Sequence, residues 1–323
     1  MTPNNNRANR EEFLASVWEK RPAILRGAYD APLLTEEELY AAIQNLWGQG
    51  GFDDLNPYFD GRNPFAGEAS VVLEPREATF EAYCAGISER LGGIPFGASI
   101  TRLERYSEIF RSKVAGVVDF LTQQSGIPAG FFNGGSFFGS YTKTPFEIHT
   151  DPAGVLTWPV RGTKRILVWP KSYFDKEPSV FDLGTHKQVL DKLENHEKGA
   201  EVLAAEPGDL MYWPADYWHA GKGTSGYHAT VTLSYYYLRS IAGLIGKTVQ
   251  ASLEARLGPK AIYWGSWDKT SNLPETIKDA LGVLRELVDN SVIDQSIQRK
   301  WNACLENGGF EPVESTGAPF WKD

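Results

Sequence analysis

The stretch Phe146-Glu-Ile-His-Thr-Asp151 places an imidazole and a carboxylate two residues apart. On an extended strand, this spacing directs the side chains of His149 and Asp151 to the same face. A second stretch, Gly208-Asp-Leu-Met-Tyr-Trp-Pro-Ala-Asp-Tyr-Trp-His219, ends in a further imidazole. Two histidines and one carboxylate form the ligand set typical of non-haem Fe(II) sites, which keep open coordination positions for other ligands.

Short β-like runs surround these two stretches between residues 129 and 239. The runs are rich in β-branched and aromatic residues, and Gly, Pro and Asp separate them, which predicts short strands joined by tight turns. Many such strands are typical of a barrel or a double-sheet sandwich. A polar segment, residues 175–199, interrupts them and is predicted to be a surface insertion. The predicted strands cover residues 157–160, 164–169, 201–204, 210–213 and 230–238.

Helical patterns flank this β core on both sides. In each of them, apolar residues recur at the spacing of an amphipathic helix, and Thr35-Glu-Glu-Glu38 has the pattern of a capping box. The segment 48–67 is rich in Gly, Asn, Asp and Pro and predicts a loop, whereas residues 69–73 predict a strand. The predicted helices cover residues 10–20, 35–46, 79–91 and 108–125, and three more follow Arg239.

We therefore expect a mainly β core with flanking helices. The expected parts are a helical N-terminal part with strands beside the core (residues 1–128), the β core itself (129–239) and a helical C-terminal part (240–323). The apolar helix faces of the C-terminal part are interpreted either as a cap packed on the core or as a homodimer interface.

Composition narrows the class of protein. The chain of 323 residues has a net charge of −9, which argues against a broad nucleic-acid-binding surface. No run approaches the roughly 20 apolar residues of a membrane span, and the polar first residues lack the apolar core of a signal peptide. Only Cys84 and Cys304 are present, so we expect no disulfide framework and a reducing, cytoplasmic setting.

The residues of the two opening stretches resemble the JmjC family of cupin-fold, Fe(II)- and 2-oxoglutarate-dependent oxygenases. The resemblance covers residues 129–238. In addition, Phe13-Leu-Ala-Ser-Val-Trp-Glu-Lys-Arg-Pro-Ala-Ile-Leu-Arg-Gly27 resembles the entry segment of the protein-hydroxylase branch, which includes asparaginyl hydroxylases and ribosomal oxygenases. The resemblance implies a double-stranded β-helix (cupin or jelly-roll) barrel in which His149, Asp151 and His219 bind Fe(II).

The resemblance also implies a pocket for 2-oxoglutarate. Lys164 stands fifteen residues after His149, where the family places the cation that pairs with the distal carboxylate of this co-substrate. A cation is also required on physical grounds, because a buried dianion is stable only next to an opposite charge. Thr157, six residues after Asp151, is at a position that often lines the pocket, and its hydroxyl could donate a hydrogen bond. The family's upstream tyrosine has four candidate counterparts, Ser99, Thr101, Tyr141 and Ser234.

Three functions follow as hypotheses. The first is hydroxylation of a side chain of a protein or peptide, with succinate and CO2 as co-products. The second is the same chemistry on a free amino acid or a natural-product intermediate, and the third is a non-enzymatic, cupin-like binding module. The structural alternatives are a strand pair for His149 and Asp151 and a solvated position for Lys164. We also expect an aromatic lining that excludes water, formed by Trp158, Trp169, Trp213 and Trp218.

Overall fold

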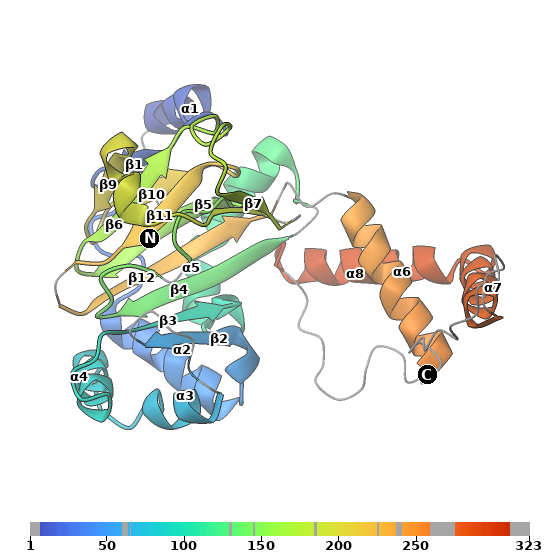
Figure 1. The fold of residues 1–323 in the computed structure, drawn as a ribbon, viewed down its shortest axis with the longest axis horizontal. Helices are drawn as coiled ribbons and strands as arrows, with labels where there is room; N and C mark the ends of the chain where they lie inside the picture. The colour runs from blue at the N-terminus through green and yellow to red at the C-terminus, as the bar shows by residue number, and fades with distance from the viewer. Residues whose placement is uncertain are drawn as a thin grey trace. The chain divides into compact units, whose positions relative to one another are not determined.

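Strand β12 (His228–Tyr235) lies at the centre of a seven-stranded antiparallel sheet (Figure 1). It pairs with β5 (Gly154–Arg161) on one side and with β4 (Phe132–Gly139) on the other. The strand order of this larger sheet is β1-β10-β5-β12-β4-β3-β2. Its other strands are β1 (Ala23–Leu25), β2 (Leu55–Phe59), β3 (Phe96–Thr101) and β10 (Leu210–Trp213).

A smaller sheet contains the segment that carries the first candidate metal ligands. Strands β9, β6 and β11 form one part of it, and the β7–β8 hairpin forms another. His149 bridges to His219 of β11 on one side and to Gln188 of β8 on the other, so residues 148–150 join the two parts in the order β9-β6-β11-(148–150)-β8-β7. The bounds are β6 (Lys164–Trp169), β7 (Val180–Asp182), β8 (Lys187–Val189), β9 (Glu201–Ala205) and β11 (Trp218–Lys222).

Helices of the N-terminal part pack on the larger sheet. The rings of Phe80 and Tyr83 on α4 lie 6.0 and 6.1 Å from the ring of Phe138 on β4. The predicted capping box is present at the start of α2, where the Thr35 side chain accepts from the backbone N–H of Glu38. The helices are α1 (Arg7–Ser16), α2 (Glu36–Gly48), α3 (Ala66–Val72), α4 (Phe80–Arg90) and α5 (Glu108–Ser125).

The computed structural model divides the chain into two compact units. The first comprises residues 1–128 and 132–238, and the second comprises 129–131 and 239–323. The second unit is helical, and its long helix α6 buries none of its described side chains. In the described part of the chain, no helix is both long and apolar enough to cross a bilayer. Helices of the second unit are α6 (Ile241–Leu257), α7 (Glu275–Asp289) and α8 (Val292–Glu306). The structure describes residues 7–59, 64, 66–128, 131–144, 146–183, 186–224, 226–236, 241–258 and 275–310.

The predicted fold class, a mainly β double-sheet core with flanking helices, is confirmed. The strand expected at residues 69–73 is wrong, because residues 69–72 belong to helix α3. The backbone N–H of Leu73 donates to the carbonyl of Ala69 (2.9 Å), and both side chains are buried. Burial of residues four apart, which share one face of a helix, outweighs the β propensity of the two valines between them.

Strands β2 and β4 were not predicted, because their sequences resemble loops. Strand β2 lies inside the segment expected to be a loop, and β4 contains Gly134 and Gly135. A Cβ at Gly134 would lie 2.5 Å from the ring of Phe110, and one at Gly135 would lie 2.5 Å from the hydroxyl of Thr232. Close approach of neighbouring side chains, and not a turn, therefore requires these glycines.

Candidate metal centre

His149, Asp151 and His219 converge as the sequence predicts. Nε2 of His219 lies 3.4 Å, and Nε2 of His149 3.9 Å, from Oδ2 of Asp151. One candidate ligand atom from each of the three residues lies within 4.8 Å of the other two. Metal–ligand bonds of about 2.1 Å let atoms up to about 4.2 Å apart share one ion. The three side chains can therefore hold a divalent ion after small adjustments.

Hydrogen bonds set the orientation of both imidazoles. The backbone N–H groups of His149 and His219 each donate to the other residue's carbonyl, at 3.0 and 2.8 Å. Nδ1 of His149 lies 3.1 Å from the carbonyl oxygen of Glu147, and Nδ1 of His219 lies 2.9 Å from that of Tyr217. An Nδ1–H that donates to a carbonyl leaves Nε2 without a proton. Both Nε2 lone pairs are thus available beside Asp151.

Two residues next to the ligands have a left-handed backbone. Glu147 has φ +50°, and Asp216 has φ +61°. The N–H of Asp216 donates to the carbonyl of Asp151 (3.0 Å), which ties the two ligand-bearing loops together. This conformation costs a non-glycine residue about 1–2 kcal/mol and is concentrated at functional sites. The local strain therefore agrees with a functional role for the turn before each histidine.

Ionisation of the triad suits metal binding. Burial, together with the nearby His219, lowers the pKa of His149 to about 4. Burial alone would raise the pKa of Asp151, but the neighbouring imidazoles, first that of His219, lower it well below its usual range. At neutral pH, His149 is thus neutral and Asp151 is ionised. These are the protonation states that a metal ion requires of its ligands.

A cavity of about 160 Å³ lies between the two sheets, and the triad belongs to its lining. The larger sheet contributes a wall of small side chains. Thr101, Gly135, Thr232 and Thr157 are cross-strand neighbours on β3, β4, β12 and β5, and all four line the cavity. Hydroxyl groups on three of these four strands therefore face the same space as the candidate ligands.

Lys164 lines the same cavity and is only 5% exposed. Its Nζ donates to the hydroxyl of Tyr141 (3.3 Å) and lies 5.1 Å from the ring centre of Phe137. Among the residues that the structure describes, no carboxylate lies within ion-pair distance of this Nζ. Because the Lys164 side chain is buried, the structural alternative of a solvated position for this residue is wrong. A buried ammonium without a counter-ion is costly, and an anionic ligand in the cavity would remove that cost.

The position of Lys164 along β6 sets the length of such a ligand. His219 pairs with Val168, which lies four residues beyond Lys164 on the same strand. At about 3.3 Å per residue, the α-carbons of Lys164 and Val168 are about 13 Å apart. The side chains of Lys164 and His219 both extend into the cavity and shorten this distance, so a short dicarboxylate can reach from the triad to the ammonium.

Two further hydrogen-bond donors in the cavity have no partner. The Thr157 side chain is fully buried, and its Oγ1 makes no hydrogen bond within the described structure. The same is true of Nε1 of Trp213, whose ring lies 5.3 Å from the ring of His219. Buried polar groups are normally paired. These donors are therefore available to a polar ligand.

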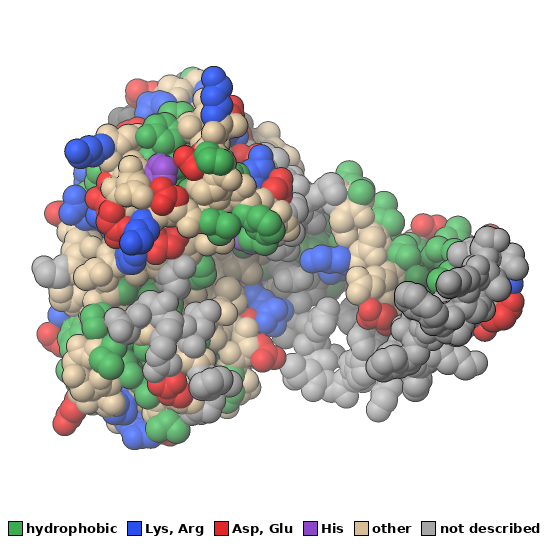
Figure 2. Space-filling model, in the orientation of Figure 1, with side chains coloured by type: hydrophobic (Ala, Val, Ile, Leu, Met, Phe, Trp, Pro, Cys, Tyr) green, Lys and Arg blue, Asp and Glu red, His purple; other side chains and the backbone are tan. Residues whose placement is uncertain are grey.

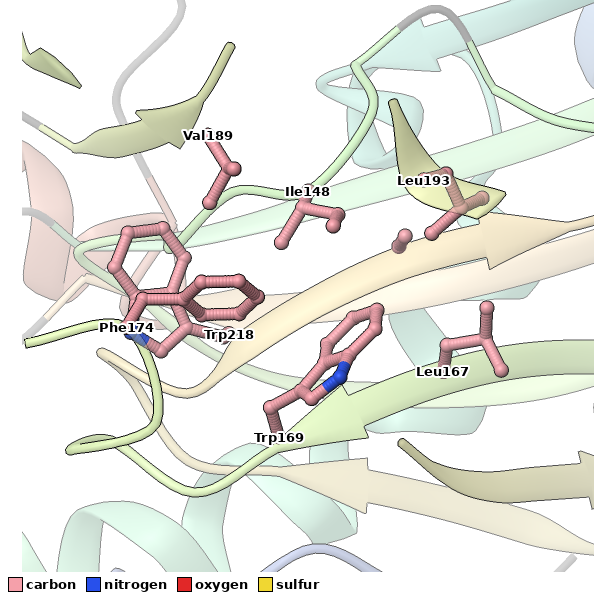
Figure 3. Close-up of a cluster of buried hydrophobic side chains, with 8 residues drawn as sticks. Ile148, Leu167, Trp169, Phe174, Val189, Leu193 and Trp218 are labelled. Carbon is pink, nitrogen blue, oxygen red and sulfur yellow. The ribbon is translucent and has the colours of Figure 1, made fainter. Parts of the chain in front are cut away.

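The expected aromatic lining is largely wrong. Of the four tryptophans, Trp213 alone is among the cavity-lining residues described. Trp169 and Trp218 lie on the outer face of the smaller sheet in an apolar cluster with Ile148 (Figure 3). Side chains alternate along a strand, so a Trp next to an inward-facing residue, such as Trp218 next to His219, faces outward. Aliphatic and small polar residues line most of the cavity instead.

Sequence reasoning identified some of the cavity residues and missed others. Of the four candidates for the upstream tyrosine, Ser99, Thr101 and Ser234 line the cavity, and Tyr141 contacts Lys164. Asn133 and Thr232 also line it and were not anticipated. The alternation Thr230-x-Thr232-x-Ser234 was the available signal, because it puts a row of hydroxyls on one face of a strand.

No protein-family model matches the chain. The uncharacterized protein YxbC of Bacillus subtilis (strain 168) is 21% identical over 326 residues, which cover 96% of this chain and 92% of YxbC. The match to the X-ray structure of Escherichia coli YcfD covers 91% of this chain and 71% of the YcfD chain. The two chains are 14% identical over this match, and the TM-score is 0.47. YcfD, a ribosomal oxygenase, in complex with cobalt and 2-oxoglutarate gives the same identity and coverage, with a TM-score of 0.48. Similarity at this level assigns the chain to no family.

Proposed function

We propose that this protein is an Fe(II)- and 2-oxoglutarate-dependent oxygenase that hydroxylates a side chain of a protein or peptide. The observation that carries the proposal is the buried ammonium of Lys164, which has no carboxylate partner among the described residues and lies in the cavity that also contains the His149, Asp151 and His219 triad. A triad alone fits many divalent ions. A buried cation in the same cavity adds the requirement for an anionic ligand.

The residues present fit both groups. Two imidazoles and one carboxylate suit Fe(II) and leave coordination positions for a chelating 2-oxoacid. Lys164 and Thr157 offer a cation and a hydrogen-bond donor to the distal carboxylate, and Tyr141 holds the ammonium by accepting its hydrogen bond. When bound, Fe(II) and 2-oxoglutarate supply the oxidising chemistry, in which O2 converts 2-oxoglutarate to succinate and CO2 and one oxygen atom enters a substrate C–H bond.

The chain itself positions the reactants and restricts water. His149 and His219 present their Nε2 atoms from two hydrogen-bonded strands, so the ligand geometry is set before any ion binds. Ile166, which lies between Lys164 and Val168 on β6, lines the cavity and offers water no hydrogen-bond partner there. Low polarity strengthens the attraction between Lys164 and an anion.

Exposure at the triad favours a large substrate. The Asp151 side chain is 37% exposed and Phe146 is 40% exposed, whereas Lys164 is 5% exposed. The cavity is thus open at Asp151 and Phe146 and closed at Lys164. A side chain that projects from a protein can reach the open side without the whole substrate being enclosed, which supports protein or peptide hydroxylation over reaction of an enclosed small molecule.

Succinate formation tests the proposal. Purified protein with Fe(II), ascorbate and 2-oxoglutarate in air should form succinate, and His149→Ala and Lys164→Ala should abolish it. Arg165→Ala is the matched control, because Arg165 is the exposed cation next to Lys164 on the same strand. Anaerobic calorimetry with Mn(II) separates binding from turnover. A wild-type protein that neither binds 2-oxoglutarate nor forms succinate would overturn the proposal.

A further inference from the structure

The β7–β8 hairpin extends the metal-bearing sheet beyond the candidate ligands. The backbone N–H of Thr150 donates to the carbonyl of Lys187, and that of Val189 donates to the carbonyl of Ile148, each at 2.9 Å. These bonds lie on the side of residues 148–150 away from His219. The hairpin is therefore a continuation of the sheet, although the polar sequence of residues 175–199 predicted only a surface insertion.

The register determines which hairpin residues share the face of the ligands. Gln188 is the cross-strand partner of His149, and Phe181 is the partner of Gln188. Partners in adjacent strands point to the same face, so His219, His149, Gln188 and Phe181 form one row. The opposite face gives an independent check, since Ile148 and Val189 pack together in the outer apolar cluster (Figure 3). Gln188 and Phe181 consequently face the side of the metal centre.

A second row lies beside the first. Next to the Thr150–Lys187 pair in these antiparallel strands, Asp151 lies opposite His186. The N–H of Leu183 in turn donates to the carbonyl of His186 (2.9 Å). We name Phe181, Leu183, His186 and Gln188 together the hairpin shelf.

The hairpin shelf combines uncovered apolar groups with polar groups. Phe181 is 52% exposed and Leu183 is 46% exposed. Figure 2 shows hydrophobic side chains on this face of the molecule over β7. Gln188 and His186 are half-buried, and the side-chain amide of Gln188 donates to the carbonyl of Phe146 (3.4 Å), which itself lines the cavity. The shelf is thus continuous with the mouth of the cavity.

Distance decides what kind of substrate the hairpin shelf can contact. Strands are about 4.8 Å apart, so β7 lies about 10 Å from the strand of His149. A free amino acid held at the metal centre is too short to reach Phe181. An extended peptide advances about 3.3–3.6 Å per residue, so its residues two or three positions from the reacting side chain reach β7.

We propose that the hairpin shelf determines substrate specificity by binding an extended segment of a protein substrate that carries an apolar side chain two or three residues from the hydroxylated one. Phe181 and Leu183 pack against that apolar side chain, and Gln188 bonds to the peptide backbone. This inference rests on the proposed function and adds the sequence context of the target. Burial of one such side chain contributes enough to change affinity about tenfold or more.

A random-sequence peptide library tests the inference. Wild-type protein and the double variant Phe181→Ser, Leu183→Ser are incubated with the library, Fe(II), 2-oxoglutarate and ascorbate, and peptides that gain one oxygen atom are sequenced by mass spectrometry. The wild type should select an apolar residue two or three positions from the modified one. The double variant should lose this preference, and its KM for the best peptide should rise about tenfold with kcat little changed.

Controls separate failure of the hairpin shelf from failure of the proposed function. Val202→Ser removes an apolar side chain of similar exposure, 47%, from β9 at the other edge of the same sheet, and should change nothing. Succinate formation without peptide should be equal in all three proteins. If the wild type forms succinate but modifies no peptide, or if the double variant keeps the preference and the KM, the shelf is overturned. If the wild type forms no succinate, the proposed function has failed first.

Discussion

The two faces of the smaller sheet are built from adjacent residues and are opposite in character. On the outer face, Ile148 and Trp218 are buried in a purely apolar cluster (Figure 3). On the inner face, their neighbours His149 and His219 present imidazoles to the cavity. A slip of one residue would turn the ligands outward and the apolar side chains inward. The outer face therefore fixes the register on which the candidate metal centre depends.

The largest expected effect comes from breaking the outer face. Trp169 is fully buried, and its Nε1–H donates to the carbonyl of His196 (3.2 Å). Trp169→Ala should lower the free energy of unfolding by about 3–5 kcal/mol, because it leaves a cavity in this cluster. Urea denaturation measures the change, with Val202→Ala at an exposed site as control. A loss below about 1 kcal/mol would mean that the outer cluster does not hold the register.

The second-largest expected effect is on the pH dependence of stability, and it arises at His228 on β12 of the larger sheet. Burial, followed by the nearby Lys164, lowers the pKa of His228 to about 4, against about 6.5 when unfolded. The unfolded state therefore takes up this proton first as the pH falls. The contribution of neutral His228 to the free energy of unfolding is therefore complete above pH 6.5. This free energy falls by up to about 3 kcal/mol as the pH falls toward 4.

The variant His228→Gln isolates that contribution. The drop in the free energy of unfolding of the metal-free protein between pH 7 and pH 4 should be smaller in this variant than in the wild type. Trp169→Ala, in contrast, should lower stability by a similar amount at both pH values. Equal drops in the wild type and His228→Gln would contradict a buried, neutral His228.

A smaller effect, of opposite sign, is expected at Lys164. Lys164→Met removes a buried ammonium that has no carboxylate partner among the described residues. The metal-free protein should gain about 1–3 kcal/mol of stability, because an unpaired polar group is no longer buried. Binding of 2-oxoglutarate should be lost in the same variant. A loss of stability would show that Lys164 holds the fold together, as the outer-face residues do.

The smallest effect is expected at Thr157, whose hydroxyl has no partner in the described structure. Thr157→Val keeps the shape of the side chain and removes the donor. Stability should change by less than about 1 kcal/mol, whereas the affinity for 2-oxoglutarate should fall about fivefold to tenfold, the value of one hydrogen bond. Calorimetric titration measures the affinity, and an unchanged Kd would exclude a contact between Thr157 and the co-substrate.

The sequence was most informative where spacing and alternation coincide. His149 and Asp151, two residues apart, and Lys164, at the start of a strand, all line one cavity, as their positions predicted. Their roles in binding a metal ion and a co-substrate stay predictions until they are measured. The alternation also explains the error over the tryptophans, since the inward position of His219 already implied that Trp218 faces outward.

Other features depended on contacts that a single sequence does not reveal. Strand β4 contains two adjacent glycines because Phe110 and Thr232 approach its backbone, and both partners are far away in the chain. The β7–β8 hairpin was predicted as a surface insertion because its residues are polar. Its pairing with residues 148–150 depends on backbone hydrogen bonds, which leave no pattern in side-chain chemistry.

The pairing of His149 with His219 also has a consequence for biosynthesis. The two residues are separated by 70 positions in the chain, from 149 to 219, and their strands bond directly to each other. A ribosome adds about 5–20 residues per second, so several seconds pass between synthesis of the first ligand and the last. A nascent chain that stops before β11 therefore lacks a complete triad. A divalent ion that needs all three side chains could therefore bind only after β11 has paired with residues 148–150.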